Sequence, residues 1–293
     1  MAREQDFLYV SARVKALETK LLGRNIIERI LDAEDAEEAV KLLSDTEYGS
    51  DLAEMDNIYD FEKVLEKSMQ RTIKTLKESF KEHRFLRFFT LKHDYHNLKV
   101  VIKCQILGED TTEYFSRLGE VAPEELMKLS EDGTAQVPEH LRVSYSKAME
   151  VYEESKDPQQ VDLVLDKALF EDMAQIVKEL KDPFLKDYFT ALVDITNIKA
   201  IARLMWMEAD GRVLDRVLLS GGILSEDMLK SLFQGSVQGI AEALANTPYS
   251  DLGQDGMACF EGDANPSEFE KRADDYLLSL ARRGLYKPFG PEP

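Results

Sequence analysis

The sequence is poor in residues that break helices and in residues that cross-link chains. It has 15 glycines, 9 prolines and 2 cysteines among 293 residues. Scarce glycine and proline beside 44% hydrophobic residues are typical of a helical protein with a substantial core. Cys104 and Cys259 stand far apart without a CxxC pairing, which favours a reduced protein over a disulfide scaffold. We therefore expect an all-α fold.

Basic residues are also scarce, with 37 Lys and Arg against 56 Asp and Glu and a formal charge of −19. Nucleic-acid binders and polybasic membrane anchors need clustered positive charge, so the composition excludes both classes. No apolar run approaches the roughly 18 residues of a transmembrane helix. The N-terminus lacks the apolar stretch of a secretory signal. We expect no nucleic-acid partner and no direct membrane span.

Familiar catalytic motifs are missing too. The sequence has neither the glycine-rich loops that bind phosphates nor the Gly-x-Ser-x-Gly turn that presents a nucleophilic serine. His93 and His96 could place two imidazoles on one helix face, but a metal needs more ligands than these. We predict no catalytic residues, no cofactor and no metal. A metal-dependent helical-bundle enzyme built on His93 and His96 remains an alternative.

The chain repeats itself. Residues 61–102 align with 161–202 at an offset of 100 without gaps, and a third copy begins where Phe269 aligns with Phe61 and Val161. Each of the first two copies is predicted to form a long amphipathic helix, a short break and a second long helix. Asp182-Pro183 marks the break in the second copy, because proline disfavours helix at the residue before it. N-cap residues stand at the same register in all three copies; they are Asn57, Asp157 and Asn265.

The segments before these long helices also match. Leu43-x-x-Thr46-x-Tyr48 recurs as Leu244-x-x-Thr247-x-Tyr249, and short helices are predicted over 25–43 and 225–245. The pattern predicts three tandem helical modules, at 1–107, 108–210 and 211–293. The third module is incomplete, because its second long helix should begin where the chain reaches Phe289–Pro293; we expect a shortened form of the gene. Three like modules can close into a pseudo-threefold body, although a row of three fits equally well.

The most informative polar residues recur on the second long helix of the first two modules. They follow the pattern Asp-x-x-Asn-[Leu/Ile]-Lys and are Asp94, Asn97, Lys99, Asp194, Asn197 and Lys199. Spacing of three places the Asp and the Asn on one helix face, where together they can satisfy a buried loop's backbone. They could instead contact a partner, but repetition favours a structural latch. We also expect Trp206, with Met205 and Met207, to pack in the core rather than form an interface.

Several segments resemble a known family. These are Tyr9-Val-Ser-Ala-Arg13, Leu42-Leu-Ser-Asp-Thr-Glu-Tyr48-Gly, Leu91-Lys-His-Asp94-Tyr-His-Asn97-Leu-Lys99 and Phe289-Gly-Pro-Glu-Pro293. In this order, over essentially the whole chain, they resemble the C subunit of prokaryotic V-type (archaeal-type) rotary ATPases, the counterpart of the eukaryotic d subunit.

The resemblance implies an all-helical, funnel-like subunit of three related modules without an active site. Such a subunit lies on the cytoplasmic side of the membrane, held there by protein partners. It receives the D/F-type subunits of the central shaft and rests on the cytoplasmic loops of the rotor ring. It transmits torque for ATP-coupled proton or sodium transport or for ATP synthesis. A generic helical adaptor that binds other proteins is the rival hypothesis.

Overall fold

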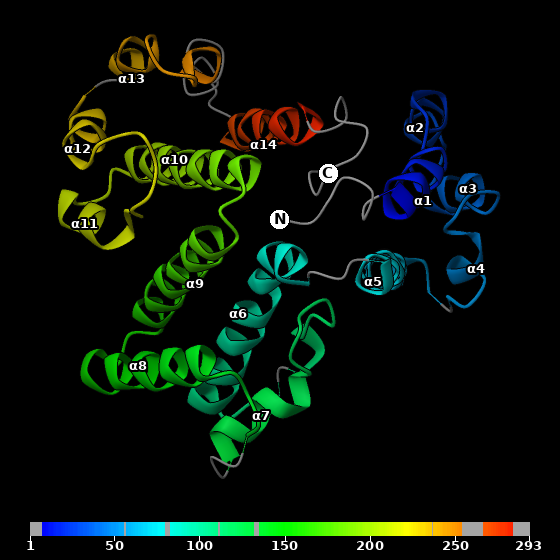
Figure 1. Ribbon diagram of the computed structural model, residues 1–293, viewed down its shortest axis with the longest axis horizontal. Helices are drawn as coiled ribbons and strands as arrows, with labels where there is room; N and C mark the ends of the chain where they lie inside the picture. The colour runs from blue at the N-terminus through cyan, green and yellow to red at the C-terminus, as the bar shows by residue number, and fades with distance from the viewer. Residues whose placement is uncertain are drawn as a thin grey trace. The chain divides into compact units, whose positions relative to one another are not determined.

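The computed structural model describes residues 8–283, except 56, 80–82, 111, 132–134, 236 and 254–265. The described residues form helices and connecting turns with no strand, which confirms the all-α prediction (Figure 1). They divide into two compact units, one that ends at Met149 and one that begins at Glu150, so the boundary falls within one helix. The division into three modules remains a prediction. No helix in the described part of the chain is long and apolar enough to cross a membrane.

The described residues of the first unit form eight α-helices, the last of which continues into the second unit. They are α1 (Leu8–Glu18), α2 (Arg24–Leu31), α3 (Ala36–Leu43), α4 (Gly49–Leu52), α5 (Phe61–Ser79), α6 (His83–Leu107), α7 (Pro123–Glu131) and α8 (Glu139–Ser155). The second unit continues with α9 (Pro158–Leu180), α10 (Pro183–Trp206), α11 (Leu214–Val217), α12 (Glu226–Gln234), α13 (Val237–Leu244) and α14 (Pro266–Arg283).

The long helices of the second unit start as their sequences predict. Asp157 accepts a hydrogen bond from the backbone N–H of Gln159, and α9 begins at Pro158. Lys181 then adopts a left-handed conformation that ends α9, and Asp182 caps α10 by accepting from the N–H of Leu185 at 2.8 Å. These caps satisfy backbone donors that the first turn of a helix leaves free. The predicted break between the two long helices is therefore confirmed.

In the first copy the start differs by one turn. Asn57 caps a short 3-10 helix over Ile58–Asp60, and α5 begins only at Phe61. In the third copy α14 begins at Pro266, as predicted, whereas its expected cap Asn265 lies outside the described residues.

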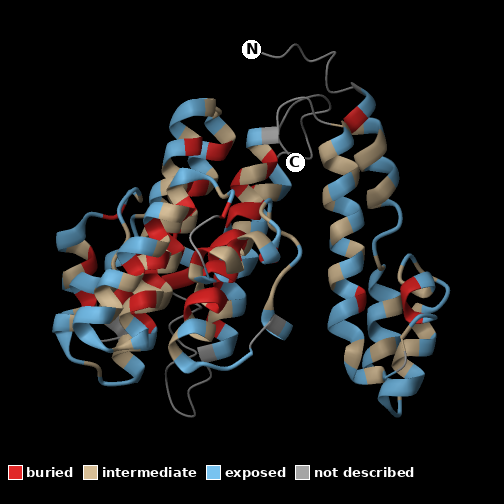
Figure 2. Cartoon of the chain, turned by 90° about the horizontal axis from the view of Figure 1, so that it is seen from below, coloured by how far each residue is buried: buried red, intermediate tan, exposed pale blue. Residues whose placement is uncertain are grey.

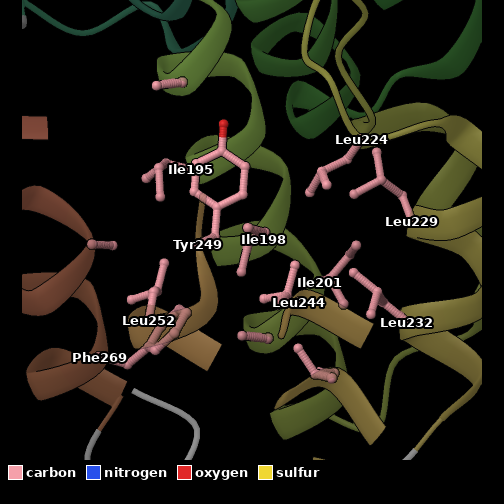
Figure 3. Packing of buried hydrophobic residues seen from close by; sticks show 14 of the residues in the cluster. Ile195, Ile198, Ile201, Leu224, Leu229, Leu232, Leu244, Tyr249, Leu252 and Phe269 are labelled. Carbon is pink, nitrogen blue, oxygen red and sulfur yellow. The ribbon is translucent and has the colours of Figure 1, made fainter. Parts of the chain in front are cut away.

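Helix α10 is the centre of the second unit and contacts α9, α11, α12 and α14 (Figure 1). Ile195, Ile198 and Ile201 of α10 belong to the same core cluster as side chains from the surrounding helices, and Figure 3 shows Ile195 and Ile198 beside Tyr249. Contact on several sides explains why α10 is apolar around most of its circumference rather than along one stripe.

Two expected core residues are exposed. Trp206 is 56% and Met207 62% exposed, so the prediction that both pack in the core is wrong. Met205 does lie against the core cluster, partly buried. The difference arises because Ala202 is the last buried residue of α10, and the helix runs one further turn to its end.

The first unit has its buried side chains concentrated on α6. Phe88, Leu91, Tyr95 and Leu98 are each at most 1% exposed, and the Tyr95 hydroxyl lies 3.1 Å from Ser144 Oγ. Helices α1 to α5 carry few buried positions, seen in Figure 2 as the near absence of red on the right-hand helices. Those positions are Val10, Asp51, Leu52 and Val64.

Candidate functional site: two helix-to-loop latches

The predicted polar pair of α6 holds one loop of the first unit. Asn97 Oδ1 accepts the N–H of Ser116 at 2.8 Å, and Asn97 Nδ2 donates to the carbonyl oxygen of Ser116 at 2.7 Å. The Asp94 carboxylate accepts the N–H groups of Glu120 at 3.2 Å and Val121 at 3.0 Å. Both polar side chains are buried, Asp94 at 2% exposure and Asn97 at 0%. We call these contacts the Asp94–Asn97 latch.

The pair on α10 makes the same contacts in the second unit. Asn197 Oδ1 accepts the N–H of Leu219 at 2.8 Å, and Nδ2 donates to the carbonyl oxygen of Leu219 at 2.9 Å. Asp194 accepts the N–H groups of Ile223 at 2.9 Å and Leu224 at 3.2 Å. This Asp194–Asn197 latch repeats the first bond for bond. The helices align at an offset of 100, but the bonded loops align at 103.

Each latch depends on a glycine at the point of closest approach. A Cβ atom on Gly119 would lie 2.3 Å from Asp94 Oδ1, and one on Gly222 would lie 1.8 Å from Asp194 Oδ1. Any side chain at these positions would displace the carboxylate from the backbone donors that it binds. A glycine is therefore required next to each carboxylate.

Tyr249 adds a third donor to the second latch. Its hydroxyl donates to Asp194 Oδ2 at 2.7 Å. Burial, followed by this bond to a carboxylate, raises the pKa of the Tyr249 hydroxyl far above its ordinary value. Tyr249 is positioned by a turn in which Thr247 Oγ1 donates to the carbonyl of Leu244 and accepts the N–H of Tyr249.

Lys199 of the repeated pattern bonds another helix rather than the loop of its latch. Lys199 pairs with Asp274 of α14 at 3.1 Å, and Arg203, one turn further along α10, pairs with Glu270 of α14. Lys99 is half-buried on α6. In each unit the predicted Asp and Asn thus bind the same loop from one helix, whereas Lys199 binds another helix.

His93 and His96 of α6 also bond the loop that follows this helix. His93 Nδ1 lies 3.0 Å from Ser116 Oγ, and His96 Nε2 lies 2.8 Å from the carbonyl oxygen of Tyr114. No cluster of three or more His, Cys, Asp or Glu side chains that could hold a metal occurs in the described residues.

Sequence reasoning missed the partners of the latches. The pair Gly221-Gly222 precedes a predicted helix, but the matching Gly119 is displaced by three residues from the register of the long helices. A search for glycine after each Asp-x-x-Asn helix, with a tolerance of a few residues, would have found both. Tyr249 belonged to a recognised repeat, although nothing in its sequence indicated that its hydroxyl reaches Asp194.

Comparison with known proteins gives the family of the chain. The sequence profile described as ATP synthase (C/AC39) subunit matches residues 10–293. The chain belongs to this family. It is 25% identical to the C subunit of the V-type sodium ATPase of Enterococcus hirae, over 96% of this chain and 85% of that one. It is 26% identical to the C subunit of the V-type ATP synthase of Thermus thermophilus, over 97% and 86% of the two chains.

An archaeal relative belongs to the same group. The C subunit of the A-type ATP synthase of Methanocaldococcus jannaschii is 26% identical, over 98% of this chain and 77% of that one. Membership of the family confirms the resemblance found in the sequence.

Replacing the glycine beside Asp194 tests the second latch. Gly222→Ala should lower the free energy of unfolding by about 2–3 kcal/mol, because buried polar groups lose their partners. Gly235→Ala is the matched control, since its Cβ would meet only atoms at 3.5 Å, and it should cost less than about 1 kcal/mol. Urea unfolding followed by circular dichroism measures both. Equal costs for the two variants would show that the close approach to Asp194 is unimportant.

The half-buried imidazole of His93 predicts a pH dependence of stability. Burial, followed by the charges of Lys92 and His96, lowers the pKa of His93 to about 4 from 6.5. The unfolded chain therefore binds a proton below pH 6.5 that the folded chain refuses, so stability is complete above pH 6.5 and declines towards pH 4.

Between pH 7 and pH 5 we expect the wild type to lose about 1–2 kcal/mol of stability that His93→Gln retains, allowing for partial solvation. Between pH 7 and pH 8 the two proteins should run parallel. Urea unfolding across this range provides the measurement. Parallel curves from pH 7 to pH 5 would contradict the lowered pKa.

Proposed function

We propose that this chain is the non-catalytic C subunit in the central stalk of a V-type or A-type rotary ATPase. In this role it links the central shaft to the membrane rotor ring, and it transmits torque between ATP turnover and proton or sodium transport. The observation that carries the proposal is the family match over residues 10–293, together with relatives that are named as the C subunits of such complexes.

The packing of the described helices supports a mechanical role. A subunit that transmits torque must resist deformation, and close-packed helical cores have low compressibility. Helix α10 is held on several sides by other helices, and its latch fixes the loop at 219–224 by four hydrogen bonds. The Asp and Asn pairs that recur in the sequence are buried, and their hydrogen bonds go to the loops of their own units. We infer that contacts with partners come from the exposed surface instead.

The partners that we propose are the D/F-type subunits of the central shaft and the cytoplasmic loops of the rotor ring. The subunit would lie on the cytoplasmic side of the membrane, as a peripheral component held by proteins. A formal charge of −19 favours partner surfaces that present basic side chains, because complementary potentials speed encounter and fix orientation. This part of the proposal predicts that binding weakens as salt screens the charges.

Isothermal titration of the full chain with purified D/F-type shaft subunits from the same organism tests the proposal. We expect binding at 50 mM salt that weakens about tenfold at 500 mM salt. An unrelated acidic protein of equal charge is the control and should not bind. A folded chain that bound neither the shaft nor the isolated rotor ring would contradict the coupling role. Salt-independent binding would contradict only the electrostatic part.

A further inference from the structure

A cavity of about 590 Å³ lies in the second unit, at the junction where α9 ends and α10 begins (Figure 1). Its lining includes apolar side chains from both helices. Val177 of α9 is half-buried, and Phe189 of α10 is 5% exposed. The volume is within the range of about 300–1,000 Å³ of small-molecule sites, which combine apolar side chains with a few charged groups.

Three lysines line this cavity. Lys178 lies in the last turn of α9, Lys181 ends that helix, and Lys186 lies near the start of α10. All three are exposed, and none forms an ion pair with a described residue. Lys199 of the same unit, by contrast, pairs with Asp274 of α14. Three ammonium groups around one cavity create a local positive potential that attracts an anion.

The cavity has little negative charge of its own. Among the described residues that line it, Asp182 is the acidic one. Its carboxylate accepts the N–H of Leu185 at 2.8 Å and so caps α10. Three positive charges against one negative charge leave an excess of two, which a ligand with two negative charges would balance.

The repeat shows that the shared fold does not require these lysines. At the offset of 100, Lys178 and Lys186 correspond to Glu78 and Leu86 of the first copy. Leu86 is buried there, at 9% exposure. The Asp and the Asn of the latches, by contrast, recur in both copies. The two lysines are therefore features of the second unit alone.

A glycine makes room in the cavity on the side of the loop. Gly221 belongs to the lining and has a φ of 117°, and a Cβ atom there would lie 3.1 Å from Cε1 of Phe189. At the offset of 103 that relates the two loops, its counterpart is Leu118. The second unit thus has no side chain where the first copy carries a leucine, and this leaves space beside the Phe189 ring.

We propose that this cavity binds a small organic phosphate. The phosphate group lies among Lys178, Lys181 and Lys186, and a flat apolar group attached to it packs against Val177 and Phe189. A phosphate monoester carries about −1.5 to −2 charges at pH 7, because its second pKa is about 6. Lysine suits this role, since it binds phosphate as a point charge. The proposal goes beyond the rotary role and does not depend on it.

The charge of the chain favours a free molecule over a lipid headgroup or an acidic protein. With a formal charge of −19, the rest of the molecule would repel an extended anionic surface. Screening limits interactions between exposed charges to about 8 Å at physiological salt. A small ligand inside the cavity therefore responds mainly to the three lysines.

Isothermal titration of the full chain with naphthyl phosphate at pH 7 tests the proposal. We expect a dissociation constant of about 100 µM. Inorganic phosphate, which lacks the apolar group, should bind at least about tenfold more weakly. The double variant Lys178→Glu with Lys186→Leu gives the cavity the residues of the first copy. It should weaken binding of naphthyl phosphate about 20-fold, because it removes two of the three positive charges and adds a negative one.

Lys271→Glu on α14 is the matched control. Lys271 is exposed and forms no ion pair with a described residue, so the variant changes the charge of the same unit away from the cavity. It should alter the affinity by less than about twofold. Circular dichroism should show that all variants fold, since the lysines that they replace are exposed.

The proposal is overturned if naphthyl phosphate fails to bind, if the double variant binds it as tightly as the wild type does, or if inorganic phosphate binds equally well. Two further titrations distinguish the source of the ligand. Phosphatidylglycerol vesicles and a polyglutamate peptide should not displace naphthyl phosphate. Displacement by the vesicles would indicate a lipid headgroup and displacement by the peptide an acidic protein, and either result would overturn the assignment to a free small molecule.

Discussion

A carboxylate inside a helical core must be surrounded by donors, because an unpaired buried charge costs several kcal/mol. In both units these donors are the backbone N–H groups of the loop that follows the long helix. At the Asp94–Asn97 latch, burial raises the pKa of the Asp94 carboxyl, and the N–H groups of Val121 and Glu120 oppose that rise. The backbone donors of the loop stabilise the buried carboxylate, and the carboxylate in turn fixes the conformation of the loop. The next short helix, α7 or α12, begins a few residues after these bonds, so its starting point depends on them.

This constraint explains why the long helix and the loop that follows it recur together in both units. The Asp, the Asn and the glycine must coincide in space for the loop to turn, and loss of any one leaves polar groups unsatisfied. In the second unit the same carboxylate also receives Tyr249 from the following segment. A single side chain on α10 thereby connects the loop before α12 to the turn after α13. Such cross-connections suit the mechanical role that we propose.

Much of this arrangement could be predicted from the sequence because it is local. Helix periodicity, the caps at Asp157 and Asp182, and the two copies of Asp-x-x-Asn follow from residues within a few positions of one another. The loop partners of the latches could not be predicted so well. Gly119 and Gly222 are 103 residues apart, whereas the long helices of the two copies align at an offset of 100. The exposure of Trp206 was missed for a different reason. It depends on where neighbouring helices stop, and no local pattern records that.

The central claim, that buried side chains fix the loops as firmly as the helices, is tested most directly by native-state hydrogen exchange. The amides of Glu120, Val121, Ile223 and Leu224 lie in loops and donate to the carboxylates of the two latches. If the account is right, they exchange as slowly as amides in the middle of the long helix of their own unit, α6 or α10, and only through unfolding of that unit. Exchange of these four amides at the rate of ordinary surface loops, while α6 and α10 stay protected, would contradict it.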